Sequence, residues 1–147
     1  MISIDANLLL YAYNEDSPRH EPALMFLTEL AAREDVAISE LVLTEFYTLL
    51  RNPAVLATPL SSGEAVQVVQ QYRHHPEWAL LGFGSDSAEL HNELWALAKR
   101  ADFSRRRIYD ARTALSLRRQ GVIEFATANV RDFKGFGFKR VWNPLDE

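Results

Sequence analysis

The sequence predicts an α/β domain whose central sheet is short-stranded and mainly parallel. Short apolar runs alternate along the chain with longer segments in which apolar residues recur every three to four positions. Short strands separated by helices favour a parallel sheet that is covered on both faces. The chain has 147 residues, enough for one hydrophobic core, and shows no repeat, linker or low-complexity tract, so we expect a single domain over residues 1–147.

The first part of the chain predicts two strands and two helices. Residues 2–4 form a short apolar strand, and residues 7–13 form one or two helical turns whose leucines supply a buried side. A helix over residues 20–33 follows from apolar residues at helical spacing, and Pro22 is tolerated because it stands in the first turn. Residues 36–38 form the second apolar strand.

The middle of the chain predicts two helices and one strand. Ser39 caps a helix that runs to about Arg51 and ends before a proline. Ser61 or Ser62 caps the next helix, whose apolar residues lie three to four positions apart. The apolar run over residues 78–83 then predicts a strand.

The last part of the chain predicts two helices and two strands. A helix over residues 86–101 is identified by its apolar stripe of Leu90, Leu94, Trp95 and Leu97. A second helix covers residues 107–119, and Gln120-Gly121 ends it. Residues 122–126 and 140–142 complete the strands of the predicted sheet.

Composition limits the chemistry that the protein can perform. The sequence contains no cysteine, which excludes disulfides, thiolate metal sites and a cysteine nucleophile. No window approaches the roughly 20 apolar residues of a membrane span, and the N-terminus lacks the basic and apolar regions of a signal peptide. We therefore expect a cytoplasmic protein without a membrane partner.

The net charge of −4 hides an asymmetry along the chain. Residues 1–98 contain 4 Lys or Arg and 14 Asp or Glu, whereas residues 99–140 contain 12 Lys or Arg and 4 Asp or Glu. A local basic surface can bind phosphates in spite of an acidic average. A solvated basic face without a partner is the alternative interpretation.

Polar side chains follow two of the predicted strands. Asp5 comes directly after strand 2–4, and the segment Thr127-Ala128-Asn129 comes directly after strand 122–126. In open α/β sheets, binding sites form beyond the carboxyl ends of the strands. The two strand ends could therefore face one crevice.

Two further acids lie on the apolar sides of predicted helices. Glu45 follows Leu41 by four residues and so shares its side of the helix, and Asp110 stands beside Ile108 and Ala111. A carboxylate near an apolar stripe is costly unless its charge is compensated. Each acid alone could pair with an arginine or cap a neighbouring element, since structural carboxylates outnumber catalytic ones.

Taken together, Asp5, Glu45 and Asp110 predict a metal site. Two carboxylates ~4 Å apart repel each other by about 4 kcal/mol at an effective dielectric constant near 20. No lysine or histidine lies close in sequence to Asp5 or Glu45, whereas a divalent cation would offset the repulsion. Oxygen ligands suit Mg²⁺ or Mn²⁺, which activates a water molecule and stabilises charge on a phosphoryl oxygen. Phosphodiester hydrolysis is the reaction that this set favours.

Four segments in this order resemble a PIN domain. They are Ile4-Asp5-Ala6-Asn7-Leu8-Leu9, Thr44-Glu45-Phe46, Ile108-Tyr109-Asp110-Ala111, and Ala126-Thr127-Ala128-Asn129-Val130-Arg131-Asp132-Phe133. The resemblance to VapC-type toxins of VapBC toxin–antitoxin pairs rests on Asp16-Ser17-Pro18-Arg19-His20, on Arg51-Asn52-Pro53 followed by Pro59-Leu60-Ser61, and on Trp142-Asn143-Pro144-Leu145. The resemblance covers essentially the whole chain.

This resemblance implies a three-layer α/β/α PIN-like domain with Mg²⁺- or Mn²⁺-dependent endoribonuclease activity. It also implies an RNA substrate, a cognate antitoxin protein as partner and, commonly, a homodimer. The first three acids of the family match Asp5, Glu45 and Asp110. The fourth position is often Asp, but Asn129 stands there and Asp132 follows three residues later. Asn129 brings no charge, so it would hold a second cation less tightly, and Asp132 could replace it.

Other polar residues are candidates for binding the substrate. Asn7 and Thr44 could orient the site or form only local hydrogen bonds. The arginines that could hold the flanking phosphates are Arg105, Arg106, Arg107 and Arg112. The first three of them could equally be solvated or bind an acidic partner.

Three other classes of protein stay open at this point. A DNA-directed nuclease would use the same chemistry, so the sequence does not separate it from a ribonuclease. A non-catalytic RNA-binding module of the same fold is disfavoured, because clustered negative charge facing phosphates would not help it to bind. An aspartyl-nucleophile hydrolase would use Asp5, but that chemistry usually needs a second acid two residues later, where this chain has Asn7.

Overall fold

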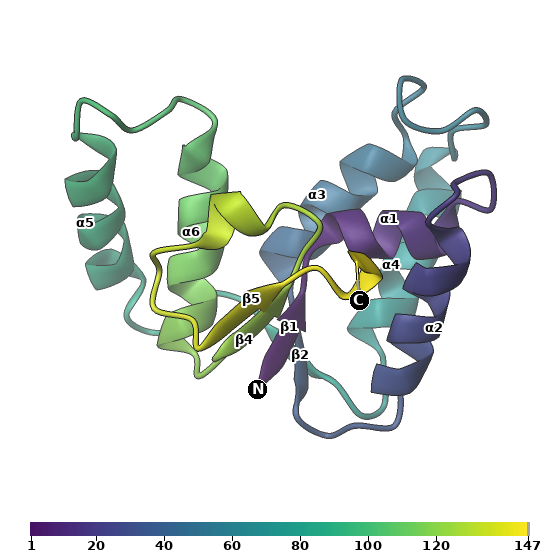
Figure 1. Ribbon diagram of the computed structural model, residues 1–147, viewed down its shortest axis with the longest axis horizontal. Coiled ribbons are helices and arrows are strands. Elements are labelled where there is room, and N and C mark those ends of the chain that lie inside the picture. The colour runs from purple at the N-terminus through teal and green to yellow at the C-terminus, as the bar shows by residue number, and fades with distance from the viewer. Residues whose placement is uncertain (147) are drawn as a thin grey trace.

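The computed structural model describes residues 1–146 and contains a five-stranded sheet between helical layers (Figure 1). Its strands are β1 (Ile2–Ile4), β2 (Val36–Ser39), β3 (Ala79–Leu81), β4 (Glu124–Ala126) and β5 (Arg140–Trp142). They lie in the order β3-β2-β1-β4-β5, and each pair of neighbours is parallel. The prediction of an α/β fold with a mainly parallel, short-stranded sheet is confirmed.

Helices cover both faces of this sheet. They are α1 (Ala6–Tyr13), α2 (His20–Leu30), α3 (Glu40–Leu50), α4 (Ser62–Arg73), α5 (Ser87–Ala98) and α6 (Arg107–Arg119), with short 3-10 helices η1 (Val130–Phe133) and η2 (Pro144–Asp146). Helices α1 to α4 lie on one side of the sheet, and α5 and α6 lie on the other (Figure 1). Within residues 1–146, no helix combines the length and the apolar character that crossing a membrane requires.

Alternate residues of the central strands pack against opposite layers. Ile4 and Ile38 join the core formed with α1 to α4, whereas Ala37 and Phe125 join a second core with α6. The central strands are therefore buried on both faces, as parallel strands usually are. Helix α5 lies outside α6, and these two helices pack through Leu90, Leu94, Ala111 and Leu115.

The order of the strands changes direction at β1 and β4, and such a switch point marks the crevice beyond the carboxyl ends of these two strands. From β1 the chain builds β2 and β3 on one side, and it later adds β4 and β5 on the other side. Helix α1 after β1 and helix α6 before β4 lie on opposite faces of the sheet (Figure 1). Ligands bind in α/β sheets at such a switch in direction, beyond the carboxyl ends of the strands. Asp5 follows β1 and Thr127 follows β4, so both lie at this crevice.

Several predicted elements were too long at their ends. Helix α2 ends at Leu30 rather than Arg33, because the next turn tightens: the amide of Arg33 donates to the carbonyl oxygen of Leu30 at 3.0 Å. Strand β3 covers only three of the residues predicted from 78 to 83, because it lies at the sheet edge and pairs only with residues 37–39 of β2. Helix α5 and strand β4 are shorter in the same way.

Candidate active site

Asp5 is held in a fixed orientation at the end of β1. Its Oδ1 accepts a hydrogen bond from the backbone N–H of Ala6 at 2.8 Å, so the carboxylate caps α1. Its Oδ2 accepts a second bond from Thr127 Oγ1 at 2.6 Å, across the crevice from β1. The residue is only 5% exposed, and burial raises its pKa even though the bonds from Thr127 and Ala6 act in the opposite direction. Asp5 is therefore an anchored but poorly hydrated acid.

Asn7 and Thr127 connect the two strand ends around this acid. Asn7 Nδ2 lies 3.4 Å from Asp5 Oδ2 as a donor, and Asn7 Oδ1 accepts from the backbone N–H of Ala128 at 3.2 Å. Thr127 Oγ1 accepts from the backbone N–H of Asn129 at 3.0 Å. Sequence reasoning did not select Thr127 as a site residue, although its place directly after a buried strand was a usable signal.

Glu45 on α3 and Asp110 on α6 line one groove of about 400 Å³ beside this crevice. Burial, followed by the charges of Asp5 and Asp110, raises the pKa of Glu45 to about 7. Burial, followed by the charges of Asp5 and Asp132, raises the pKa of Asp110 to about 6, with Arg107 acting in the opposite direction. The acids predicted from separate segments thus lie close enough to repel one another.

The donor set fits a divalent cation in its chemistry. In the part of the chain that the structure describes, the carboxylates of Glu45 and Asp110 form no ion pair, and of the charged groups that act on them only Arg107 is positive, beside Asp110. Among residues 1–146, no three acidic or histidine side chains lie close enough together to hold a metal ion by themselves. An ion at this crevice would therefore take some of its ligands from water, as Mg²⁺ usually does.

Of the two residues proposed for the fourth ligand position, Asp132 carries a negative charge and Asn129 does not. Asp132 in η1 is close enough to raise the pKa of both Asp5 and Asp110. Asn129 is exposed just before η1, and its carbonyl oxygen accepts a bond from the backbone N–H of Asp132 at 3.0 Å. The structure thus places the carboxylate of Asp132 near those of Asp5 and Asp110.

The remaining candidate residues differ in whether they line the groove that contains Glu45 and Asp110. Thr44 and Arg112 line the groove, although the hydroxyl of Thr44 donates locally to the carbonyl oxygen of Glu40 at 2.8 Å. The guanidinium of Arg107 lies 5.2 Å from the ring centroid of Phe136, and its charge reaches Asp110. Arg105 and Arg106 lie exposed before α6 and are not among the residues that line the groove.

Comparisons with known sequences identify the family to which the chain belongs. The PIN domain family matches residues 2–139 of the chain. Ribonuclease VapC24 of Mycobacterium tuberculosis (strain CDC 1551 / Oshkosh) is 52% identical over 145 residues, which make up 99% of this chain and 97% of that protein. The protein of the same name from strain H37Rv matches to the same extent.

Solved structures share the fold at lower sequence identity. VapC20 of Mycobacterium tuberculosis, described as a sarcin-ricin loop cleaving toxin, has a TM-score of 0.63 at 20% identity and covers 85% of this chain and 87% of its own. VapBC2 from Rickettsia felis, solved with a DNA fragment from its promoter, has a TM-score of 0.65 at 18% identity, with 97% and 98% covered. FitAcB from Neisseria gonorrhoeae has a TM-score of 0.64 at 20% identity, with 98% of each chain covered.

Proposed function

Because this chain belongs to the PIN-domain family, and within it to the VapC ribonucleases, we propose that it is a metal-dependent endoribonuclease of the toxin type. The observation that carries the proposal is the convergence of Asp5, Glu45 and Asp110 at the end of a parallel sheet. An acidic groove repels the phosphates of a nucleic acid, so this cluster would hinder a protein that only binds RNA. With a cation bound, the same cluster supports hydrolysis.

The acids have separate parts in the reaction. Asp5, Glu45 and Asp110 would hold Mg²⁺ or Mn²⁺, with Asp132 or Asn129 as a further ligand. When bound, such an ion would activate a water molecule and stabilise negative charge on the phosphoryl oxygen. Burial and the charges of Asp5 and Asp110 raise the pKa of Glu45 to about 7, and Glu45 lines the groove. We therefore assign Glu45 to help hold the cation and to orient the attacking water.

The residues around the acids position the reactants. Thr127 and Asn7 keep the Asp5 carboxylate in place, and Thr44 forms part of the groove wall. Arg112 lines the groove, and Arg107 lies one helical turn before Asp110 in α6. Their guanidinium groups therefore bind the phosphates on either side of the cut. Arg105 and Arg106 are exposed and contact the RNA farther from the cut.

The partners follow from the family. The protein acts as the toxin of a toxin–antitoxin pair, in the cytoplasm, as a single nuclease domain over residues 1–147 that forms a homodimer and is inhibited by a cognate antitoxin protein. The identity to a VapC ribonuclease and the shared fold of the VapBC2 toxin–antitoxin structure support this assignment.

The test is cleavage of total cellular RNA by the purified, antitoxin-free protein. Reactions with Mg²⁺, with Mn²⁺ and with EDTA are compared, and new 5′ ends are mapped by sequencing. Wild type should give discrete, metal-dependent cuts, and Asp110→Asn and Glu45→Gln should lose them. Glu77→Gln, a change of an exposed glutamate outside the groove, serves as the control and should cut normally. A folded wild type that cuts no RNA with either metal would refute the proposal and direct the assay to DNA.

A further inference from the structure

Two exposed aromatic rings lie beside the acidic groove. Tyr109 on α6 is 69% exposed, and Trp95 on α5 is 61% exposed. Both rings line a pocket of about 250 Å³ between α5 and α6, together with His91, Leu94, Ile108 and Arg112. Apolar side chains gathered on an exposed surface indicate a binding site more often than isolated ones do.

This pocket continues the groove that contains the acids. Tyr109 and Arg112 line both spaces, and Tyr109 directly precedes Asp110 in α6. A chain-like ligand whose reacting group lies at Glu45 and Asp110 would therefore pass its next unit over the two rings. The continuity connects the aromatic pocket to the reaction rather than to an unrelated surface.

Arg112 gives the pocket a positive charge that no carboxylate neutralises. Within residues 1–146 its guanidinium forms no ion pair, and it lies 5.8 Å from the ring centroid of Phe83. An unpaired guanidinium beside two exposed rings matches the phosphate and base of a nucleotide. A purely apolar partner surface would leave this charge without a counter-charge.

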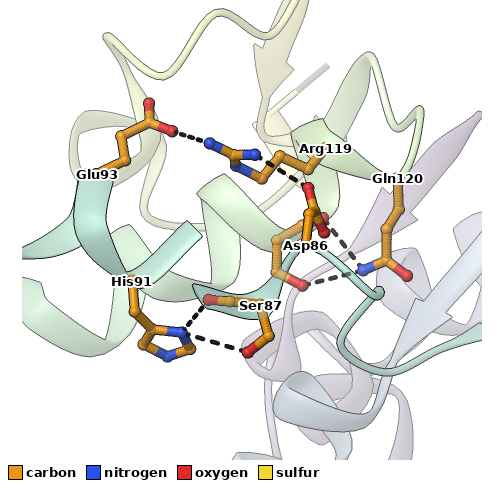
Figure 2. Close-up of polar contacts among 7 residues, drawn as sticks. Asp86, Ser87, His91, Glu93, Arg119 and Gln120 are labelled. Atoms are coloured by element: carbon orange, nitrogen blue, oxygen red, sulfur yellow. Dashed lines mark hydrogen bonds and ion pairs between the residues drawn. The ribbon is translucent and has the colours of Figure 1, made fainter. Parts of the chain in front are cut away.

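A polar network joins α5 to the C-terminal end of α6 (Figure 2). Arg119 of α6 donates to Asp86 Oδ2 at 2.9 Å and to Glu93 Oε2 at 3.0 Å, so it ties the first half of α5 to the end of α6. Gln120 Nε2 donates to the carbonyl oxygen of Gly82 at 2.7 Å. These contacts fix how the end of α6 lies against the first half of α5, and the same two helices carry Trp95 and Tyr109.

We propose that Trp95 and Tyr109 form a stacking site for one unpaired base of the RNA substrate, with Arg112 on the adjoining phosphate. The inference rests on the proposed ribonuclease function and names a determinant of its substrate preference. Single-stranded RNA is recognised by stacking its bases on aromatic rings, whereas bases in a duplex are not available for stacking. Pockets for drug-sized ligands hold about 300–1,000 Å³, so a pocket of about 250 Å³ suits one base.

The test measures binding separately from cleavage. The full chain carrying Asp110→Asn, which prevents cleavage, is titrated in Mg²⁺ with a fluorescein-labelled single-stranded A10 RNA and with a duplex of the same length, and anisotropy gives the Kd. Trp95→Ala and Tyr109→Ala should weaken A10 binding about five- to one-hundred-fold, and Trp95→Phe should retain most of it. Met25→Ala, a change of an exposed residue on α2 across the sheet, is the matched control and should bind normally.

Salt dependence separates stacking from charge. Trp95→Ala should raise the Kd without changing the slope of log Kd against log salt, whereas Arg112→Ala should make that slope shallower. Circular dichroism and light scattering confirm the fold and the oligomeric state of each variant.

Three outcomes would overturn the inference. In the first, Trp95→Ala and Tyr109→Ala bind A10 as the parent does. In the second, Met25→Ala weakens binding as much as they do. In the third, they lower the oligomeric state and leave the Kd unchanged, which would assign this face to contacts between copies of the chain. Ring-dependent A10 binding by a wild type that cuts no RNA would instead refute only the hydrolytic function.

Discussion

Raising the pH should destabilise the metal-free protein, and Glu45→Gln should remove part of this loss. The pKa of Glu45 rises from 4.5 in an ordinary glutamate to about 7 here, first because of burial and then because of Asp5 and Asp110. Between these two values the folded state binds more protons than the unfolded chain. The free energy of unfolding therefore falls as the pH rises through this window.

The size of the effect follows from the same values. A change of pKa from 4.5 to about 7 corresponds to a ceiling of about 3.4 kcal/mol at 1.36 kcal/mol per pKa unit. Because Glu45 is exposed at the groove surface, solvent screening reduces the expected effect to about 1 kcal/mol. Asp110 contributes with the same sign between pH 3.8 and about 6.

The assay is urea unfolding in EDTA at pH 5 and pH 8, followed by circular dichroism. The free energy of unfolding should drop more between the two pH values in wild type than in Glu45→Gln, by about 1 kcal/mol. Glu77→Gln should behave as wild type does, and Mg²⁺ should restore stability at pH 8. Identical pH dependence in wild type and Glu45→Gln would refute the reasoning, because Glu45 would then not be confined among the other acids.

Three further predictions concern single side chains. Thr127→Val removes the hydroxyl donor 2.6 Å from Asp5 Oδ2, so it should lower the free energy of unfolding by about 1–3 kcal/mol and slow cleavage. Thermal unfolding and initial cleavage rates measure the two effects. Unchanged values in both assays would exclude an orienting role for Thr127. Ser61→Ala breaks the capping box with Glu64 and should cost about 1 kcal/mol in urea unfolding without changing the cleavage rate, so a slower enzyme would contradict it. Asn129→Asp adds a carboxylate beside Asp132 and should tighten Mn²⁺ binding in calorimetry; equal affinity would place residue 129 outside the metal site.

Much of the fold could be predicted from the sequence, because short apolar runs and helical spacing are local patterns. Each predicted strand and helix has a counterpart in the structure, and the errors are confined to element ends such as that of α2. The apolar stripe of α5 was less informative. It includes Trp95, which is 61% exposed, whereas Leu90, Leu94 and Leu97 of that stripe pack into the core between α5 and α6.

The candidate acids could also be selected from the sequence, since Asp5 ends a buried strand and Glu45 and Asp110 lie on apolar sides of helices. The sequence identifies these three acids as candidates, and the catalytic and metal-binding roles of the three acids stay predictions. The bond from Thr127 to Asp5 could not be predicted, because 122 residues separate the two along the chain and only the parallel pairing of β1 with β4 brings them together.

The sequence by itself therefore determined the alternating elements, the uneven distribution of charge and the set of candidate acids, since each depends on neighbours within a few residues. Only the tertiary structure showed that Thr127 at the end of β4 hydrogen-bonds to Asp5 at the end of β1. It also decided that Asp132 lies close enough to act on Asp5 and Asp110, and that Tyr109 and Arg112 join the acidic groove to an aromatic pocket. These contacts depend on the strand order β3-β2-β1-β4-β5, which is set by packing between segments far apart in the chain.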